Sequence, residues 1–317
     1  MDVIITPMPK NDNKDSRKLA IIALIVVSAL WGVASPVIKV TLNYIPPFSF
    51  LTIRFLVASF ILYFLVDWKK GYLKHLGKKG LLYALLLGVL GSSVNLGLLF
   101  WGINFTTSIE ATIIYSMAPI LIILGGVVFL KEEIQTRELL GILIALFGFG
   151  LIIIKPLLFE SSKVIINFEG NILVLLSTVA WVAYALLSKN IFNHDKTGTK
   201  YSPVFITFIT FFAGAVSMLP FGIYEILTTP IFWAKATPGI LYMAVAGTVI
   251  AYTLYEFGVK KIEVSETAIF QYLQPLFTIP IAMMFIGEDF SFIYLVGGIL
   301  VAAGVFLSEH HPVKIKR

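Results

Sequence analysis

The chain of 317 residues is 58% hydrophobic and 13% charged, with a mean hydropathy of +0.91. A soluble domain of this size could not bury so much apolar surface, so the composition excludes a water-soluble globular protein and predicts one that lies in lipid. The absence of cysteine excludes a disulfide framework, a thiolate metal site and a cysteine nucleophile. The net charge of +6 comes from basic residues spread over many short segments, so it does not indicate nucleic-acid binding.

The apolar runs predict an all-α membrane protein. Crossing about 30 Å of hydrocarbon takes roughly 20 apolar residues in a helix, and the chain offers such runs repeatedly after a polar segment at 1–18. That segment carries no convincing cleavage site, so we expect it to remain attached. The predicted transmembrane helices are ten, at 19–38, 48–66, 81–104, 108–130, 139–155, 171–188, 202–224, 239–258, 265–286 and 291–308.

The distribution of lysine and arginine between the loops predicts the orientation of the chain. If the N-terminus is cytoplasmic, 19 basic residues fall on the cytoplasmic side and 4 on the external side, while Arg54 lies inside the second span. We therefore expect an integral protein of a prokaryotic plasma membrane, with both termini in the cytoplasm.

An internal repeat relates the two halves of the chain. EATIIYSMAP at 110–119 and ETAIFQYLQP at 266–275 each place a glutamate nine residues before a proline, at an offset of 156 residues. Other residues align in the same frame: Pro47 with Pro203, Gly91 with Gly247, Gly102 with Gly258, Glu132 with Glu288 and Gly148 with Gly304. Further upstream the offset is 150, where Trp31 meets Trp181 and Lys39 meets Lys189.

Each half contains five predicted spans, an odd number, so the second half should be inverted relative to the first. Inverted repeats are typical of transporters, because two halves related by an axis in the membrane plane can expose one site to either side. A channel would be compatible with the same symmetry.

Several motifs resemble the EamA domain of the drug/metabolite transporter superfamily. They are LWGVASPVIK followed by IPPFSFLTIRF, and YSMAPILIILGGVVFLKEE with GILIALFGFGLI. In the second half AWVAYALLSK keeps the tryptophan and the lysine but lacks the glycine and proline, and Thr210 stands where the first half has Arg54. The resemblance implies ten transmembrane helices in two inverted EamA-like repeats. The expected organisation is a cytoplasmic segment at 1–18, repeats at 19–155 and 171–308, an external linker at 156–170 and a cytoplasmic tail at 309–317.

The resemblance implies a secondary carrier, facilitator or exporter that moves a small polar organic metabolite, such as an amino acid, by alternating access. Drug-like compounds and nucleotide sugars are the alternative substrates, and a channel or an intramembrane enzyme is a more remote alternative. Enzyme chemistry is not expected, because all four histidines and all six aspartates fall in loops or tails and no Walker-type phosphate loop is present. We expect no catalytic residue, metal or cofactor. The expected partners are a small solute and the bilayer, without nucleic acid, for a monomer or a dimer.

Neutral polar and aromatic side chains on the spans are candidates for the wall of a central cavity. Tyr115 and Gln271 are repeat mates, each four residues before the aligned proline, and we expect them to face each other across the cavity. A phenol opposite an amide would suit a polar, uncharged or zwitterionic solute. The full set of candidates is Trp31, Asn95, Tyr115, Trp181, Tyr184, Tyr252, Gln271, Tyr272 and Gln274.

Ionisable residues in lipid are expensive, so each needs a structural or functional reason. Arg54 could pair with an anionic group of the solute, but we favour an arginine that snorkels or binds backbone carbonyls. Glu110 and Glu266 open spans 4 and 9, where a carboxylate stabilises a helix N-terminus at the interface, and Thr107 has capping-box spacing to Glu110. A gating or proton-responsive role for the two glutamates is the alternative.

Glu256 breaks the repeat symmetry, and we expect it at the interface, paired with Lys260 one helical turn along. Pro119 and Pro275 fall in mid-span, where each should remove a backbone hydrogen bond and kink its helix around the cavity. Because no carboxylate is expected at mid-depth, the sequence favours facilitation or exchange over proton coupling.

Overall fold

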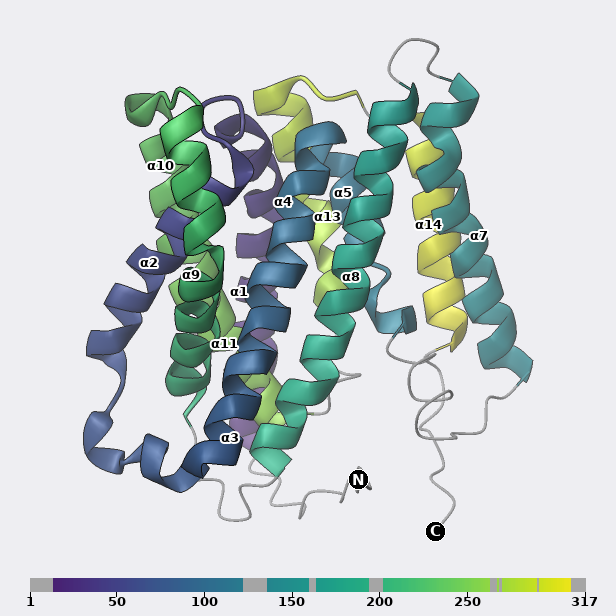
Figure 1. The fold of residues 1–317 in the computed structure, drawn as a ribbon. Helices are drawn as coiled ribbons and strands as arrows, with labels where there is room; N and C mark the ends of the chain where they lie inside the picture. Colours follow the sequence, from purple (N-terminus) through teal and green to yellow (C-terminus); the bar gives the residue numbers. More distant parts are fainter. Residues whose placement is uncertain are drawn as a thin grey trace.

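The structure is a computed structural model that describes residues 14–121, 136–159, 164–193, 202–262, 267, 270–289 and 291–308. Within these ranges the chain is helical and has no β-strand (Figure 1). The elements are α1 (Lys14–Thr41), α2 (Pro47–Leu65), η1 (Trp68–Lys70), α3 (Tyr72–Val89), η2 (Leu90–Val94), α4 (Asn95–Phe105), α5 (Ser108–Tyr115), α7 (Thr136–Phe159), α8 (Val164–Asn193), α9 (Pro203–Thr228), α10 (Trp233–Ala244), η3 (Val245–Ile250), α11 (Ala251–Lys261), η4 (Phe270–Leu273), α13 (Gln274–Ile281), η5 (Ala282–Ile286) and α14 (Phe292–Ser308). The predicted residue Glu266 lies outside the described part of the chain.

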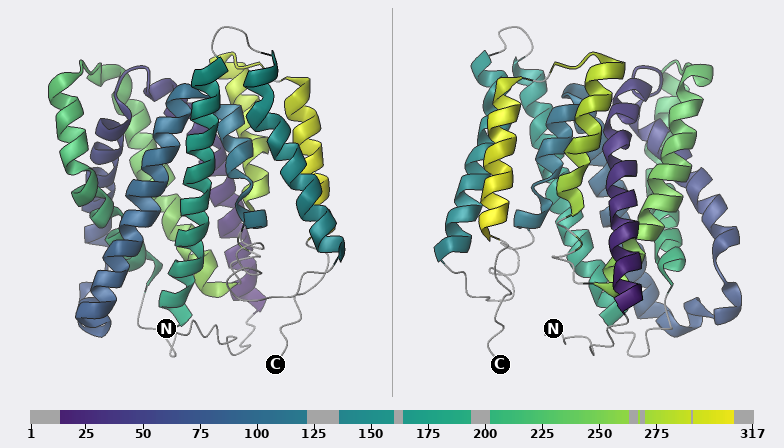
Figure 2. Two further views of the ribbon diagram at one scale, coloured as in Figure 1. Left: turned by 45° about the vertical axis from the view of Figure 1, so that its right-hand side comes forward. Right: turned by 180° about the vertical axis from the view of Figure 1, so that it is seen from behind.

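Six helical stretches of the described chain are long and apolar enough to cross a membrane, and the long helices run roughly alongside one another (Figure 2). They are Asp15–Thr41, Pro47–Leu65, Leu76–Phe105, Phe168–Ser188, Pro203–Thr228 and Trp233–Lys261. Shorter apolar helices fall within the other four predicted spans, at Ser108–Leu121, Leu139–Gly148, Phe270–Ile286 and Phe292–Gly304. Large apolar side chains such as Phe60, Leu227 and Phe285 are 68%, 79% and 78% exposed, as expected where the surrounding solvent is lipid.

The two halves share the same helical irregularities. The π-helical segments η2 and η3 occupy corresponding places, and α4 and α11 begin and end 156 residues apart. The residue after each helix donates its backbone N–H to an aligned glycine: Thr106 N to Gly102 O, and Ile262 N to Gly258 O. The repeat frame read from the sequence therefore corresponds to matched local geometry.

Packing between the halves follows the same frame. α2 packs along α9 and α7 along α14, which are equivalent helices of the two halves. In the same way α4 packs on α8, and α1 packs on α11. Figure 1 shows α1 and α8, the first long helices of the two halves, running in opposite directions.

Pro119 and Pro275 both lie beside an interruption of the α-helical bonding. α5 ends at Tyr115, and Met117 N then bonds to Ile114 O, a tighter turn than an α-helix makes. In the second half the 3₁₀ segment η4 precedes α13, whose first turn contains Pro275. Pro275 therefore lies at the change from 3₁₀ to α-helical bonding, inside the apolar stretch Phe270–Ile286.

Gly91 lies where η2 packs against α8, and it leaves no room for a side chain. A Cβ at this position would collide with the fully buried ring of Tyr184. Overpacking of this kind costs about 1–3 kcal/mol, so we expect Gly91→Ala to lower the thermal unfolding temperature of the protein in detergent. Gly150→Ala is the matched control, because a Cβ there meets nothing within 4 Å. Equal unfolding temperatures for the two variants would show that the contact with Tyr184 does not constrain the fold.

Candidate functional site

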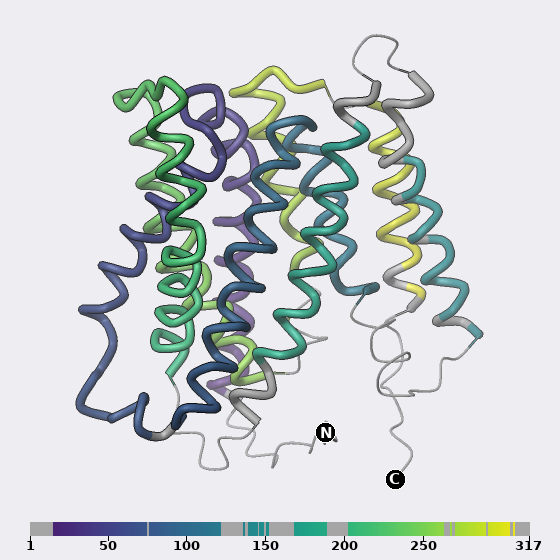
Figure 3. Tube along the Cα trace, in the orientation of Figure 1, coloured from purple at the N-terminus to yellow at the C-terminus, as the bar shows by residue number. Residues whose placement is uncertain are grey.

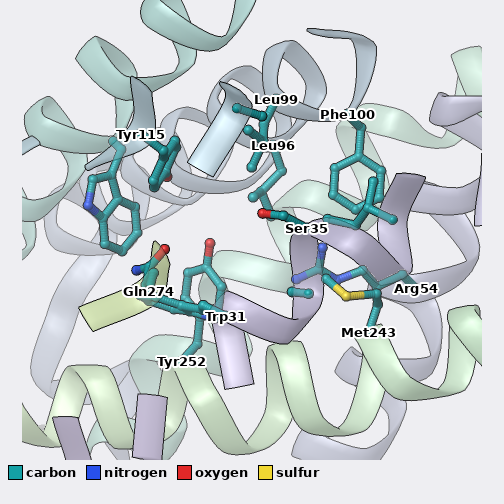
Figure 4. A pocket seen from close by; sticks show the side chains of 14 residues that line it. Trp31, Ser35, Arg54, Leu96, Leu99, Phe100, Tyr115, Met243, Tyr252 and Gln274 are labelled. Carbon is teal, nitrogen blue, oxygen red and sulfur yellow. The ribbon is translucent and has the colours of Figure 1, made fainter. Parts of the chain in front are cut away.

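A cavity with about 500 Å³ of empty volume, counting the part open to solvent, lies between helices of the two halves (Figure 4). The lining residues are Trp31, Ala34, Ser35, Ile38, Arg54, Leu96, Leu99, Phe100, Ala111, Tyr115, Trp181, Met243, Tyr252 and Gln274. They come from α1, α2, α4 and α5 of the first half and from α8, α10, α11 and α13 of the second.

Five of the candidates proposed from the sequence line this cavity: Trp31, Tyr115, Trp181, Tyr252 and Gln274. The ring centroid of Trp31 lies 5.4 Å from that of Trp181 and 5.0 Å from that of Tyr252, both edge to face. The ring of Tyr115 lies 6.2 Å from Trp181. Edge-to-face contacts are a favourable arrangement of aromatic pairs, so this wall is a connected cluster.

Four polar groups point into the same space: the hydroxyls of Ser35 and Tyr252, the amide of Gln274 and the guanidinium of Arg54 (Figure 4). Ser35 was missed by the sequence analysis. The spacing of Trp31, Ala34, Ser35 and Ile38 is i, i+3, i+4, i+7, which places them on one face of a helix. That spacing, starting from Trp31, is the signal that could have found Ser35.

Arg54 is only 1% exposed, so it does not snorkel to the membrane surface. Its Nε donates to Thr248 Oγ1 at 2.7 Å and its Nη2 to Gly247 O at 3.4 Å, which ties α2 to η3. Nη1 has no hydrogen-bond partner, and no carboxylate forms an ion pair with Arg54 within the described residues. Nε and Nη2 are thus bonded to η3, whereas Nη1 has no hydrogen-bond partner among the described residues.

Two further candidates, Asn95 and Tyr184, lie behind the wall rather than in it. Asn95 is fully buried, and its Oδ1 accepts hydrogen bonds from Tyr115 Oη at 3.0 Å and from Ser177 Oγ at 3.3 Å. It is therefore a positioning residue that orients the phenol of Tyr115. Tyr184 donates its hydroxyl to Glu256 Oε1 at 2.6 Å.

Glu256 corrects an expectation from the sequence. Its side chain is 0% exposed and accepts the hydrogen bond of Tyr184, so it is not an interfacial residue. The physical reason is that α11 packs against α1, α8 and α9, which cover this turn of the helix.

Gln271 and Tyr272 do not line the cavity. Gln271 is buried, and its amide atoms have no hydrogen-bond partner within the described residues. The expected pairing of Tyr115 with Gln271 across the cavity is therefore not observed. Gln271 lies in η4, a 3₁₀ segment with about 3.0 residues per turn, so its side chain does not point where an α-helix would direct it. Gln274, the first residue of α13, does line the cavity.

Glu110 is fully buried in the first turn of α5, so its carboxylate does not face water there. Its backbone amide donates to Thr107 Oγ1 at 3.0 Å, as the capping-box spacing predicts, but its carboxylate accepts from the hydroxyls of Thr106 and Tyr294. The bond from Tyr294 connects the start of α5 to α14 of the other half.

The carboxylate that caps α5 belongs to Glu288, from the segment before α14. Glu288 accepts from Ser108 N at 2.8 Å, Ser108 Oγ at 2.9 Å and Ile109 N at 3.1 Å. The trace after η5 passes over this end of the bundle, where α1 also finishes (Figure 3). The sequence analysis aligned Glu288 with Glu132 but assigned it no role.

Lys39 lies at the same end, in the last turn of α1. Its ammonium donates to Ile103 O at 2.8 Å, Asn104 O at 3.3 Å and Thr106 O at 2.5 Å. These carbonyls terminate α4, where a cation is favoured by the helix dipole. Lys39 therefore joins α1 to the end of α4.

Comparison with known proteins gives relatives along almost the whole chain. An uncharacterized transporter of Archaeoglobus fulgidus is 29% identical over 287 residues, covering 90% of this chain and 95% of the relative. Proteins named "Probable amino-acid metabolite efflux pump" from Salmonella typhimurium and Escherichia coli are 27% and 26% identical, each covering 92% of this chain and 95% of the relative. A solved crystal structure, 15% identical, superposes with a TM-score of 0.60 over 93% of this chain and 97% of its own, so the fold is shared.

The model of the EamA-like transporter family matches the chain twice, at residues 18–154 and 168–309. These ranges contain the two sets of helices that meet at the cavity. The apolar helices and the two matches together identify the chain as a membrane protein that belongs to the EamA-like transporter family.

Proposed function

We propose that the chain is a secondary carrier, facilitator or exporter that moves a small polar organic metabolite, such as an amino acid, by alternating access. The observation that carries the proposal is the central cavity, whose wall is built from both halves and into which Ser35, Arg54, Tyr252 and Gln274 direct polar groups. A site shared by two halves can open to either side when the halves rock against each other. Transport rather than an enzymatic reaction agrees with the relatives named as efflux pumps.

The proposed architecture is ten membrane spans in two inverted repeats. It is supported by the packing of equivalent helices, α2 on α9 and α7 on α14, and by the opposite directions of α1 and α8. The proposed orientation places both termini in the cytoplasm of a cell with a prokaryotic plasma membrane. The bias of lysine and arginine between the loops supports that orientation.

Alternating access also needs contacts that close one end of the cavity. Glu288 on the amides of α5 and Glu110 on Tyr294 each connect the first half to the second. We propose that these bonds, all near the end where α1 finishes, hold that end closed when the cavity faces the opposite side.

Flux through the purified protein in liposomes tests the function. Liposomes are loaded with a panel of amino acids and related metabolites, and counterflow of each radiolabelled solute is followed with and without a pH gradient. We expect saturable counterflow of at least one solute, absent from empty liposomes. Folded, reconstituted protein that moves none of the panel would contradict the proposal, and flux that never saturates would favour the channel alternative.

A further inference from the structure

We infer that the cavity recognises its solute by a carboxylate bound at Arg54 and by an apolar or aromatic body, and that it does not require an amino group. The inference rests on the proposed transport function and names the substrate class of that same cavity. The class is therefore monocarboxylates, which include hydrophobic amino acids and the corresponding 2-oxo and 2-hydroxy acids.

Arg54 carries the first part of the argument. A buried polar group without a partner is unfavourable, and Nη1 of this guanidinium has none within the described residues. Nη2 makes only a long bond of 3.4 Å to Gly247 O, so both terminal nitrogens can offer an N–H to a ligand. Carboxylates match the planar fork of a guanidinium through two parallel hydrogen bonds. Thr248 holds Nε at 2.7 Å and so fixes the guanidinium at the cavity wall.

The charges of the residues that line the cavity support the second part of the inference, that the solute needs no amino group. Among the described residues that line the cavity, Arg54 is the charged one and none is an aspartate or glutamate. The buried carboxylates Glu110 and Glu256 lie elsewhere and accept hydrogen bonds from Tyr294 and Tyr184. An ammonium group on the solute would therefore find ring faces and neutral oxygens but no opposite charge, whereas a carboxylate would find one.

The remaining wall determines the body of the solute. Aromatic side chains form one part of it, and the other part is aliphatic: Ala34, Ile38, Leu96, Leu99, Ala111 and Met243. Burial of an apolar group against this surface favours binding, whereas desolvation of a second charge opposes it. A dicarboxylate should therefore bind more weakly than a monocarboxylate of the same size.

Matched ligands test the inference on the unmodified protein. Phenylalanine, phenylpyruvate and phenethylamine share one ring and differ in the carboxylate and the amine, and leucine, its 2-oxo acid and its decarboxylated amine form a second series. Binding is measured by the shift in thermal unfolding of the purified chain in detergent. We expect each amino acid and its 2-oxo acid to bind with similar affinity, and each amine to bind at least about tenfold more weakly, as the loss of a charged hydrogen bond predicts.

Variants assign the discrimination to Arg54. Arg54→Met should reduce the difference between phenylalanine and phenethylamine to less than about threefold, since the bond that separates them is removed. Thr210→Ala is the matched control, because Thr210 stands at the equivalent position of the second half, does not line the cavity and should keep the full difference. The ligand series on the unmodified chain remains decisive even if Arg54→Met does not fold.

The outcomes separate this inference from the proposed function. An amine that binds as tightly as its amino acid overturns carboxylate recognition, and a 2-oxo acid that fails to bind overturns independence from the amino group. If neither acid binds while another solute shows counterflow in liposomes, the substrate class is wrong and transport stands. If the acids bind as expected but no solute shows flux, recognition stands and the transport proposal fails.

Discussion

Glu288→Ala should lower the free energy of unfolding by about 2–3 kcal/mol, because one carboxylate caps α5 with three hydrogen bonds. Two of the donors are backbone amides of the first helical turn, which have no partner within α5 itself. The positive end of the helix dipole adds to the stabilisation. The measurement is thermal or denaturant unfolding of the purified protein in detergent.

The control for Glu288 is Asp289→Asn, which removes a negative charge from the neighbouring exposed position. If the loss came from the net charge of the segment rather than from the cap, both variants would be destabilised alike. We expect Asp289→Asn to stay within about 0.5 kcal/mol of the unmodified protein. Glu288→Gln should be intermediate, because an amide oxygen can accept from only part of the donor set and carries no charge.

Lys39→Met should be the second large effect, with a loss of about 1.5–3 kcal/mol, the range for hydrogen bonds to a charged group. The ammonium accounts for three carbonyl contacts at the end of α4, and methionine keeps the length of the side chain without any donor. Two of the three bonds are partly buried, so water would replace the lost donor only in part. The same unfolding measurement in detergent tests it.

Lys235→Met serves as the comparison for Lys39. Lys235 lies in the first turn of α10, is exposed, and contacts the ring of Tyr44 from 5.2 Å. An exposed contact of this kind contributes about 0.5–1 kcal/mol. A loss in Lys39→Met no larger than in Lys235→Met would show that the carbonyls of α4 do not depend on the ammonium.

Much of the fold was readable from the sequence because lipid restricts the possible structures. Spanning helices need a minimum apolar length, so the six long helices appear where apolar runs predicted them. The 156-residue offset predicted that α4 and α11 correspond, and both end with a hydrogen bond to an aligned glycine carbonyl, Gly102 O or Gly258 O. The π-helical form of η2 and η3 was not predictable, since it depends on which neighbouring helices pack there.

The candidate site was only partly readable. Aromatic residues of the first helices of each half, Trp31 and Trp181, were found because large side chains at aligned positions stand out. Gln271 does not line the cavity as predicted, because it lies in a 3₁₀ segment that changes the direction of its side chain. Gln274, a second candidate from the sequence, does line the cavity. Glu256 was misplaced because nearby lysines suggested a helix end in water, whereas its partner Tyr184 lies on a helix from another part of the chain.

The central claim, alternating access to one cavity, is tested most directly by the reactivity of a single thiol at position 35. The chain has no cysteine, so Ser35→Cys introduces one reactive site in the wall of the cavity. Its labelling by a membrane-impermeant reagent is measured in right-side-out and inside-out vesicles, with and without Glu288→Ala. Alternating access predicts labelling from both sides, and it predicts that Glu288→Ala speeds labelling from the side it loosens and slows labelling from the other. Labelling from one side only, or rates that rise on both sides together, would contradict the account.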